Sequence, residues 1–125
     1  MKLSTFLVIK AVVCIVFGLG FVAIPATVSS IYEITLDPNG LMMARLYGSV
    51  FFGVGLIVLL CRNANWNALK DITLSLAIAD SIGFIVALSA QLSGILNSLG
   101  WINAALWLIF ALGLWYYRFL RPNKA

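Results

Sequence analysis

Two charged side chains, Lys10 and Asp80, interrupt stretches of sequence that are otherwise apolar enough to lie within a membrane. A lone charge near the centre of a bilayer costs about 2.5–3.5 kcal/mol on insertion scales, so such residues tend to pair or to serve a function. Counting about 1.5 Å per helical residue places both side chains roughly 9–12 Å below the same membrane surface. The sequence therefore predicts a buried Lys10–Asp80 ion pair that fixes helix register. It leaves open a proton- or ligand-responsive role for the Asp80 carboxylate.

A second group of polar side chains is predicted near the opposite membrane surface. This outer polar cluster consists of Glu33, Arg45, Gln91 and Asn103. Glu33 and Arg45 carry the opposite charges needed for an ion pair, and the two amides offer hydrogen bonds. The alternative is a site for an anion or a lipid headgroup, because the guanidinium of Arg suits phosphate and carboxylate groups.

Aromatic side chains in the same stretches are the candidates for a lipophilic pocket. The predicted lining residues are Phe17, Phe21, Phe52, Phe84 and Trp107. The chain contains no His, and the sequence shows no nucleophile–base set, glycine-rich phosphate loop or metal-ligand cluster. We therefore expect no catalytic residues, no metal and no cofactor, and we favour a protein that is not an enzyme.

The elements that must position these side chains are membrane spans. The chain is 63% hydrophobic and 10% charged, with a mean hydropathy of +1.08, whereas soluble domains are nearer half apolar and a quarter charged. Four apolar runs of about 20 residues are each long enough to cross a bilayer. They cover about residues 6–26, 41–61, 72–92 and 99–120, with an outer loop at 27–40. We predict an all-α membrane protein, a single domain over 1–125 built as an antiparallel four-transmembrane-helix bundle.

The basic residues indicate the direction of the spans. Lys and Arg are concentrated before the first span, between the second and third, and at and beyond the end of the fourth: Lys2, Arg62, Lys70, Arg118, Arg121 and Lys124. The outer loop carries the acids Glu33 and Asp37 instead. The positive-inside rule therefore predicts that both termini are cytoplasmic. The net charge of +4 is spread over several loops rather than gathered on one face, so we expect no nucleic-acid binding.

Local sequence adds two finer expectations. The residues "DPNG" (37–40) are typical of a turn, and "ATVSSIYEI" (26–34) favours a short helix on the outer membrane surface. Small residues at helical spacing predict close helix packing. They are Gly48, Ser49, Gly53 and Gly55 in the second span, and Ser75, Ala79, Gly83 and Ala87 in the third.

The segment "ATVSSIYEITLDPNGLMMARLYGSVFFGVGLIVLLCRNA" follows the proline that ends the first span and contains "YEITLD" and "ARLYGSVFFGVGL". In these features the first half of the chain resembles small four-helix bacterial inner-membrane proteins of the DoxX-like and related uncharacterised kind. The resemblance implies an antiparallel four-helix bundle in the bacterial inner membrane, and it raises interest in Arg45, Tyr47 and Gly48. Small multidrug transporters share the length and span count, but their essential acid lies in the first span, where this chain has Lys10.

Together these observations favour a small non-enzymatic integral membrane protein that contacts membrane lipids. We expect it to bind a lipophilic ligand or a partner membrane protein, with a homo-oligomer as one form of the latter. Two alternatives stay open. One is a small proton-coupled transporter in which Asp80 titrates, and the other is a membrane enzyme acting on a lipid or a quinone.

Overall fold

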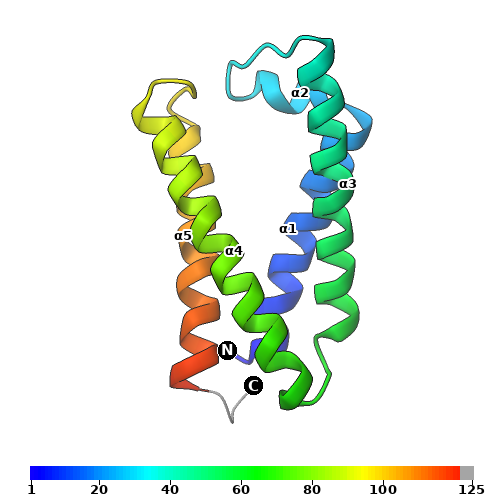
Figure 1. Cartoon of the computed structure of the whole chain (residues 1–125), viewed down its shortest axis with the longest axis vertical. Helices are drawn as coiled ribbons and strands as arrows, with labels where there is room; N and C mark the ends of the chain where they lie inside the picture. Colours follow the sequence, from blue (N-terminus) through cyan, green and yellow to red (C-terminus); the bar gives the residue numbers. More distant parts are fainter. Residues whose placement is uncertain (122–125) are drawn as a thin grey trace. The chain divides into compact units, whose positions relative to one another are not determined.

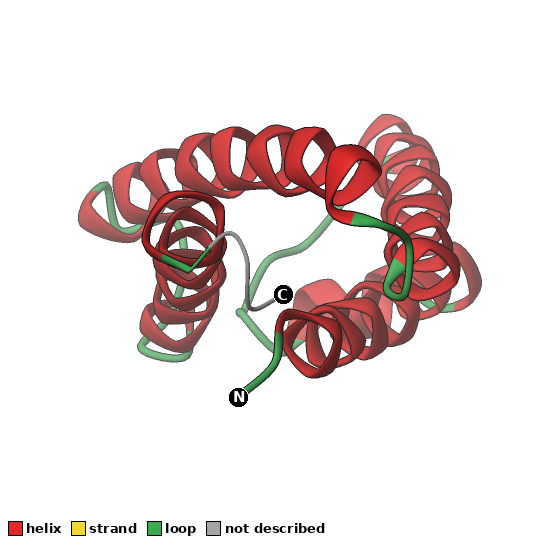
Figure 2. Ribbon diagram, turned by 90° about the horizontal axis from the view of Figure 1, so that it is seen from below, coloured by secondary structure: helices red, strands yellow, loops and turns green. Residues whose placement is uncertain are grey.

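Helices make up the regular structure of the part of the chain that is described, residues 1–121 of a computed structural model (Figure 1). The elements are α1 (Leu3–Ala23), α2 (Pro25–Ser30), α3 (Pro38–Cys61), α4 (Trp66–Leu92), α5 (Gly100–Trp115) and the π-helix η1 (Tyr116–Leu120). Within that range the chain has no strand, and Figure 2 shows helices joined by loops. Lys124, one of the basic residues used to predict orientation, lies outside the described residues.

Four of the helical segments are long and apolar enough to cross a membrane. They are Leu3–Ala23, Pro38–Cys61, Trp66–Leu92 and Gly100–Leu120. Each exceeds the roughly 20 residues that a hydrocarbon layer of about 30 Å requires. The prediction of an all-α, four-helix integral membrane protein is thus confirmed. The orientation with both termini cytoplasmic stays a prediction.

Two of the helix boundaries that differ from the predicted spans are explained by single residues, Pro25 and Asn65. α1 ends at Ala23, because Pro25 lacks an amide proton and starts the new helix α2. α4 begins at Trp66, well before the predicted start at residue 72. Asn65 precedes it as the N-cap residue, and its side-chain oxygen accepts a hydrogen bond from the amide of Ala68 at 3.1 Å.

The "DPNG" segment starts a helix, so the predicted turn is wrong. Pro38 is the first residue of α3, and the Asp37 carboxylate accepts a hydrogen bond from the amide of Gly40 at 2.6 Å. An acidic cap followed by proline is a favoured helix start, because proline has no amide proton to leave unsatisfied. The short helix predicted nearby is found at Pro25–Ser30.

The described chain divides into two compact units. The first contains Met1–Phe6 and the chain from Arg62 onward, and the second contains Leu7–Cys61. The first unit contains the pair of α4 and α5, and the second contains α3 with α1 from Leu7 onward. The prediction of a single membrane domain stays a prediction.

In the second unit, α1 and α3 approach each other at glycines. A Cβ atom added to Gly18 would lie 2.6 Å from the backbone nitrogen of Phe52, and one added to Gly55 would lie 2.8 Å from the Ile15 side chain. Real side chains essentially never approach so closely, so only glycine fits at these places. The predicted packing role therefore holds for Gly48 and Gly55, whereas an added Cβ at Gly53 would meet nothing within 4 Å.

In the first unit, α4 and α5 lie side by side as an antiparallel hairpin (Figures 1 and 2). The Trp107 ring occupies the space that a Cβ atom at Gly83 would need, which is the close packing predicted there. The Trp115 indole donates a hydrogen bond to the Ser81 hydroxyl at 3.0 Å, and that hydroxyl donates to the Ala77 carbonyl at 2.7 Å.

The start of α1 belongs to the same unit and packs on the end of α5. The Phe6 ring lies 5.9 Å from that of Phe110 and 5.5 Å from that of Tyr117, centre to centre. The Tyr117 hydroxyl donates a hydrogen bond to the Met1 carbonyl at 2.6 Å. At this end α5 widens into the π-helix, which closes with a hydrogen bond from the Arg121 amide to the Tyr116 carbonyl at 3.2 Å.

Candidate functional site

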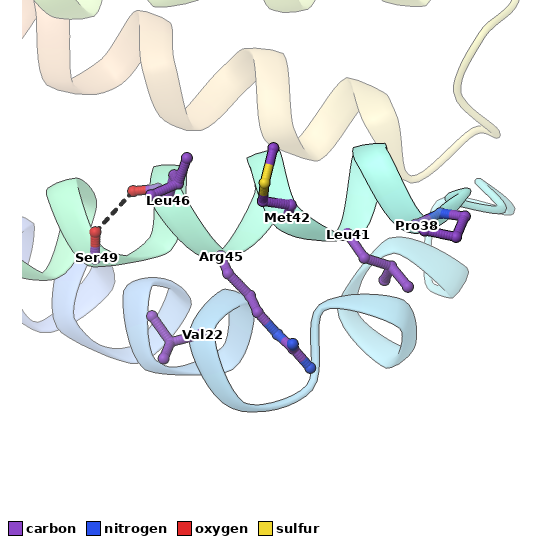
Figure 3. A pocket seen from close by; sticks show the side chains of 7 residues that line it. All are labelled: Val22, Pro38, Leu41, Met42, Arg45, Leu46 and Ser49. Atoms are coloured by element: carbon purple, nitrogen blue, oxygen red, sulfur yellow. Dashed lines mark hydrogen bonds between the residues drawn. The ribbon is translucent and has the colours of Figure 1, made fainter.

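The second unit contains a shallow, open and largely apolar pocket of about 470 Å³. It is formed by the last turn of α1 and the first half of α3. Its lining residues, drawn in Figure 3, are Val22, Pro38, Leu41, Met42, Arg45, Leu46 and Ser49. Both helices end near it, so the pocket lies at one end of two candidate membrane spans.

Helical spacing explains how one wall of the pocket forms. From Pro38 to Ser49 the α3 lining residues recur every three or four positions, which places them on one stripe about 16 Å long. Val22 of α1 also lines the pocket, because α1 and α3 touch next to it. A Cβ atom at Gly48 would lie 2.9 Å from the Val22 amide nitrogen.

Arg45 is the charged residue among the side chains that line the pocket. Its guanidinium carries five N–H donors and suits a phosphate or a carboxylate. Figure 3 shows its side chain extending from α3 toward the turn between α1 and α2. The Ser49 hydroxyl already donates to the Leu46 carbonyl at 2.9 Å, so its proton is in use. Arg45 is therefore the side-chain donor that this pocket offers to an anion.

The exposure of Arg45 differs from the sequence-based expectation. Arg45 shares a helical face with Gly48 and Phe52, and this spacing alone predicts that its side chain points into the bundle; in the structure the side chain is exposed. Gly48 packs against the last turn of α1, which ends at Ala23. Arg45 lies nearly one turn closer to the start of α3 than Gly48, and at that level α1 has already ended.

Lys10 and Asp80 are both deeply buried. Each is 2% exposed, Lys10 on α1 and Asp80 on α4, and both make interactions with other groups. They belong to different units, so their mutual ion pair stays a prediction. Thr73 is also buried on α4, and its hydroxyl has no hydrogen-bond partner within residues 1–121.

The predicted outer polar cluster is divided between the two units. Glu33 is exposed in the turn after α2, with a φ of 58°, and it shares the second unit with Arg45. Gln91 and Asn103 lie in the first unit, where the Gln91 amide donates a hydrogen bond to the Asn97 carbonyl at 3.2 Å. A single cluster of all four residues stays a prediction.

The predicted aromatic lining is likewise distributed. The Phe21 ring meets that of Tyr47 edge to face at 5.4 Å, and Trp107 packs on Gly83. The remaining members are half-buried: Phe17, Phe52 and Phe84. None of the five predicted aromatics lines the pocket beside Arg45. Sequence reasoning missed Met42 and Leu46, although the stripe at the start of α3 was a usable signal.

Known proteins were compared with this chain at three levels. No family model, no curated protein and no solved structure matches it. The DoxX-like resemblance therefore stays a prediction. Within residues 1–121 there is no group of three or more His, Cys, Asp or Glu side chains that could hold a metal ion.

Proposed function

We propose that this integral membrane protein binds a lipophilic ligand in the pocket formed by α1 and α3. The observation that carries the proposal is the pocket itself, whose lining is apolar except for Arg45 and Ser49. Pockets that orient a ligand typically combine an apolar wall with a few polar groups in this way. A bilayer lipid, or another molecule with an apolar chain, has the matching chemistry.

The position of the pocket supports a ligand that enters from the membrane. Met42 and Leu46 are 56% and 55% exposed, and both lie on a candidate membrane span. A ligand bound along Met42 and Leu46 separates these side chains from bulk lipid, and Arg45 orients the polar end of the ligand. Such a ligand falls among the membrane lipids that the protein is expected to contact.

Native mass spectrometry of the protein released from detergent micelles tests the proposal. The wild-type protein should retain a lipophilic molecule, and Leu46→Trp should lose it because the indole fills the pocket. Ile57→Trp is the matched control, since Ile57 is an equally exposed aliphatic residue of α3 outside the pocket. A wild-type protein without adducts, or equal retention by both variants, would overturn the proposal.

The second candidate function is a proton-coupled transporter. It is favoured by Asp80, a deeply buried ionisable residue of the candidate span α4. Ionisable residues within membrane spans commonly mark proton or substrate pathways. In proteoliposomes carrying a pH gradient, Asp80→Asn should abolish proton flux under this candidate. Lys70→Gln, which changes a charge near the start of α4, should leave flux intact. Wild-type vesicles as tight to protons as empty ones would exclude the candidate.

A further inference from the structure

Resting on the proposed lipophilic pocket, we infer that Arg45 binds the phosphate of an anionic phospholipid whose head carries no cation. The pocket side chains then contact the first part of an acyl chain. Three features support this ligand class: the position of Arg45, the charges around it and the path of the apolar wall.

Arg45 lies near one end of the α3 span, from which a long side chain can reach toward phospholipid phosphates. It lies two helical turns from Pro38, the first residue of α3, which is about 10 Å along the helix axis. Its side chain extends toward the turn between α1 and α2 (Figure 3). Long basic side chains near helix ends commonly reach the headgroup layer in this manner. An Arg45 side chain that extends toward this helix end brings its guanidinium from inside the span toward the layer where bilayer phosphates lie.

The charges at the pocket favour one negative group on the ligand. Arg45 supplies one cation, and the lining residues include no carboxylate. The Asp37 carboxylate keeps its negative charge, but the Gly40 amide holds it at the start of α3, about two helical turns from Arg45. A phosphodiester matches the Arg45 charge, whereas the ammonium of a choline headgroup would find no acid among the lining residues.

The apolar wall gives the acyl chain a direction. From Arg45 the lining continues along α3 through Leu46 to Ser49, with Val22 of α1 beside it. This direction leads from the helix ends toward the middle of the span. A lipid whose phosphate contacts Arg45 can therefore lay its chain along the wall in the orientation of the surrounding bilayer.

The test uses the full chain in nanodiscs made from equal amounts of phosphatidylglycerol and phosphatidylcholine with identical acyl chains. Lipids retained after transfer to detergent are counted by native mass spectrometry. The wild-type protein should retain phosphatidylglycerol over phosphatidylcholine by about fivefold, as expected for one exposed charge pair. Arg45→Gln should lose the headgroup preference but still retain lipid, and Arg45→Lys should keep part of the preference. Lys70→Gln removes one positive charge outside the pocket and should retain the full preference.

The outcomes separate this inference from the proposed function. Lipid retention without headgroup preference, or a preference that survives Arg45→Gln, would overturn the phosphate contact and leave the lipophilic pocket standing. Retention of added oleate in place of phosphatidylglycerol would also overturn it, since the anion would then be a carboxylate. Absence of any retained lipid, or its survival in Leu46→Trp, would overturn the proposed function itself.

Discussion

A Cβ atom at Gly48 would lie 2.7 Å from the carbonyl oxygen of Gly18, so the backbones of α3 and α1 touch at this point. The contact sets the distance between the two helices that form the pocket. It also brings Val22 beside Leu46 and Arg45, because Gly48 packs against the same turn of α1. The pocket geometry therefore depends on a glycine that does not line it.

Replacing Gly48 with alanine should destabilise the protein by about 1–3 kcal/mol, the usual cost of overpacking a close contact. Gly53→Ala is the matched control on the same helix, where an added Cβ meets nothing within 4 Å. That change should be neutral, or stabilising by up to about 1 kcal/mol through helix propensity. Denaturant unfolding in mixed micelles measures both. Equal effects of the two substitutions would contradict the contact.

The hydrogen bond from the Trp115 indole to the Ser81 hydroxyl should contribute to α4–α5 packing. A double-mutant cycle with Ser81→Ala and Trp115→Phe should give a coupling of about 0.6 kcal/mol, the average for hydrogen bonds between membrane helices. Ser75→Ala serves as a control, because the Ser75 hydroxyl donates within α4 to the Asp71 carbonyl. Additive effects of the Ser81 and Trp115 changes would show that the bond contributes nothing.

The predicted pairing of Lys10 with Asp80 has a thermodynamic signature. Asp80→Asn alone should cost about 3–5 kcal/mol, because a buried ammonium would lose its partner. Lys10→Met combined with Asp80→Leu should cost much less than the sum of the two single changes, since an apolar pair needs no compensation. The measurement is equilibrium unfolding of Asp80→Asn, of Lys10→Met and Asp80→Leu singly, and of their combination. Additivity of the two changes would show that each side chain has a different partner.

Tyr32, which lies between α2 and α3, should make the stability of the protein depend on pH in the alkaline range. Burial raises the pKa of its phenol above the usual 10.0 by disfavouring the charged form. In the window between 10.0 and the raised pKa, the unfolded chain loses this proton while the folded chain keeps it, so stability falls as pH rises. Tyr32→Phe should lose this part of the decline, as measured by unfolding at a series of alkaline pH values. An identical decline in the variant would assign it to other groups.

The sequence predicted the spans because twenty-residue apolar runs follow directly from bilayer thickness. The start of α3 was predicted less accurately, because "DPNG" contains residues that form turns and that also begin helices. Whether such a segment forms a turn or starts a helix depends on the residues that follow it, and here Asp37 caps α3. The early end at Ala23 and the early start at Trp66 depend on single residues, Pro25 and Asn65, whose effect a hydropathy profile does not show.

The candidate site was predicted in part, and packing explains the difference. Arg45 was identified as a candidate anion-binding residue, but its exposure depends on where α1 ends, a few residues before the predicted limit at 26. The pocket wall of Met42 and Leu46 could be predicted only with knowledge of which α3 face meets α1. That face is chosen by Gly48 and Gly55, whereas Gly53, which is equally small, meets no neighbour.

The π-helix at the end of α5 has a consequence for sequence length. Its hydrogen bond from the Arg121 amide to the Tyr116 carbonyl spans one residue more than an α-helical bond. Deleting one residue between Tyr116 and Leu120 would therefore allow the segment to continue as a regular α-helix instead of breaking it. At this point the backbone has the geometry that a single inserted residue produces in an α-helix. We expect a change in chain length to be accommodated here at the lowest structural cost.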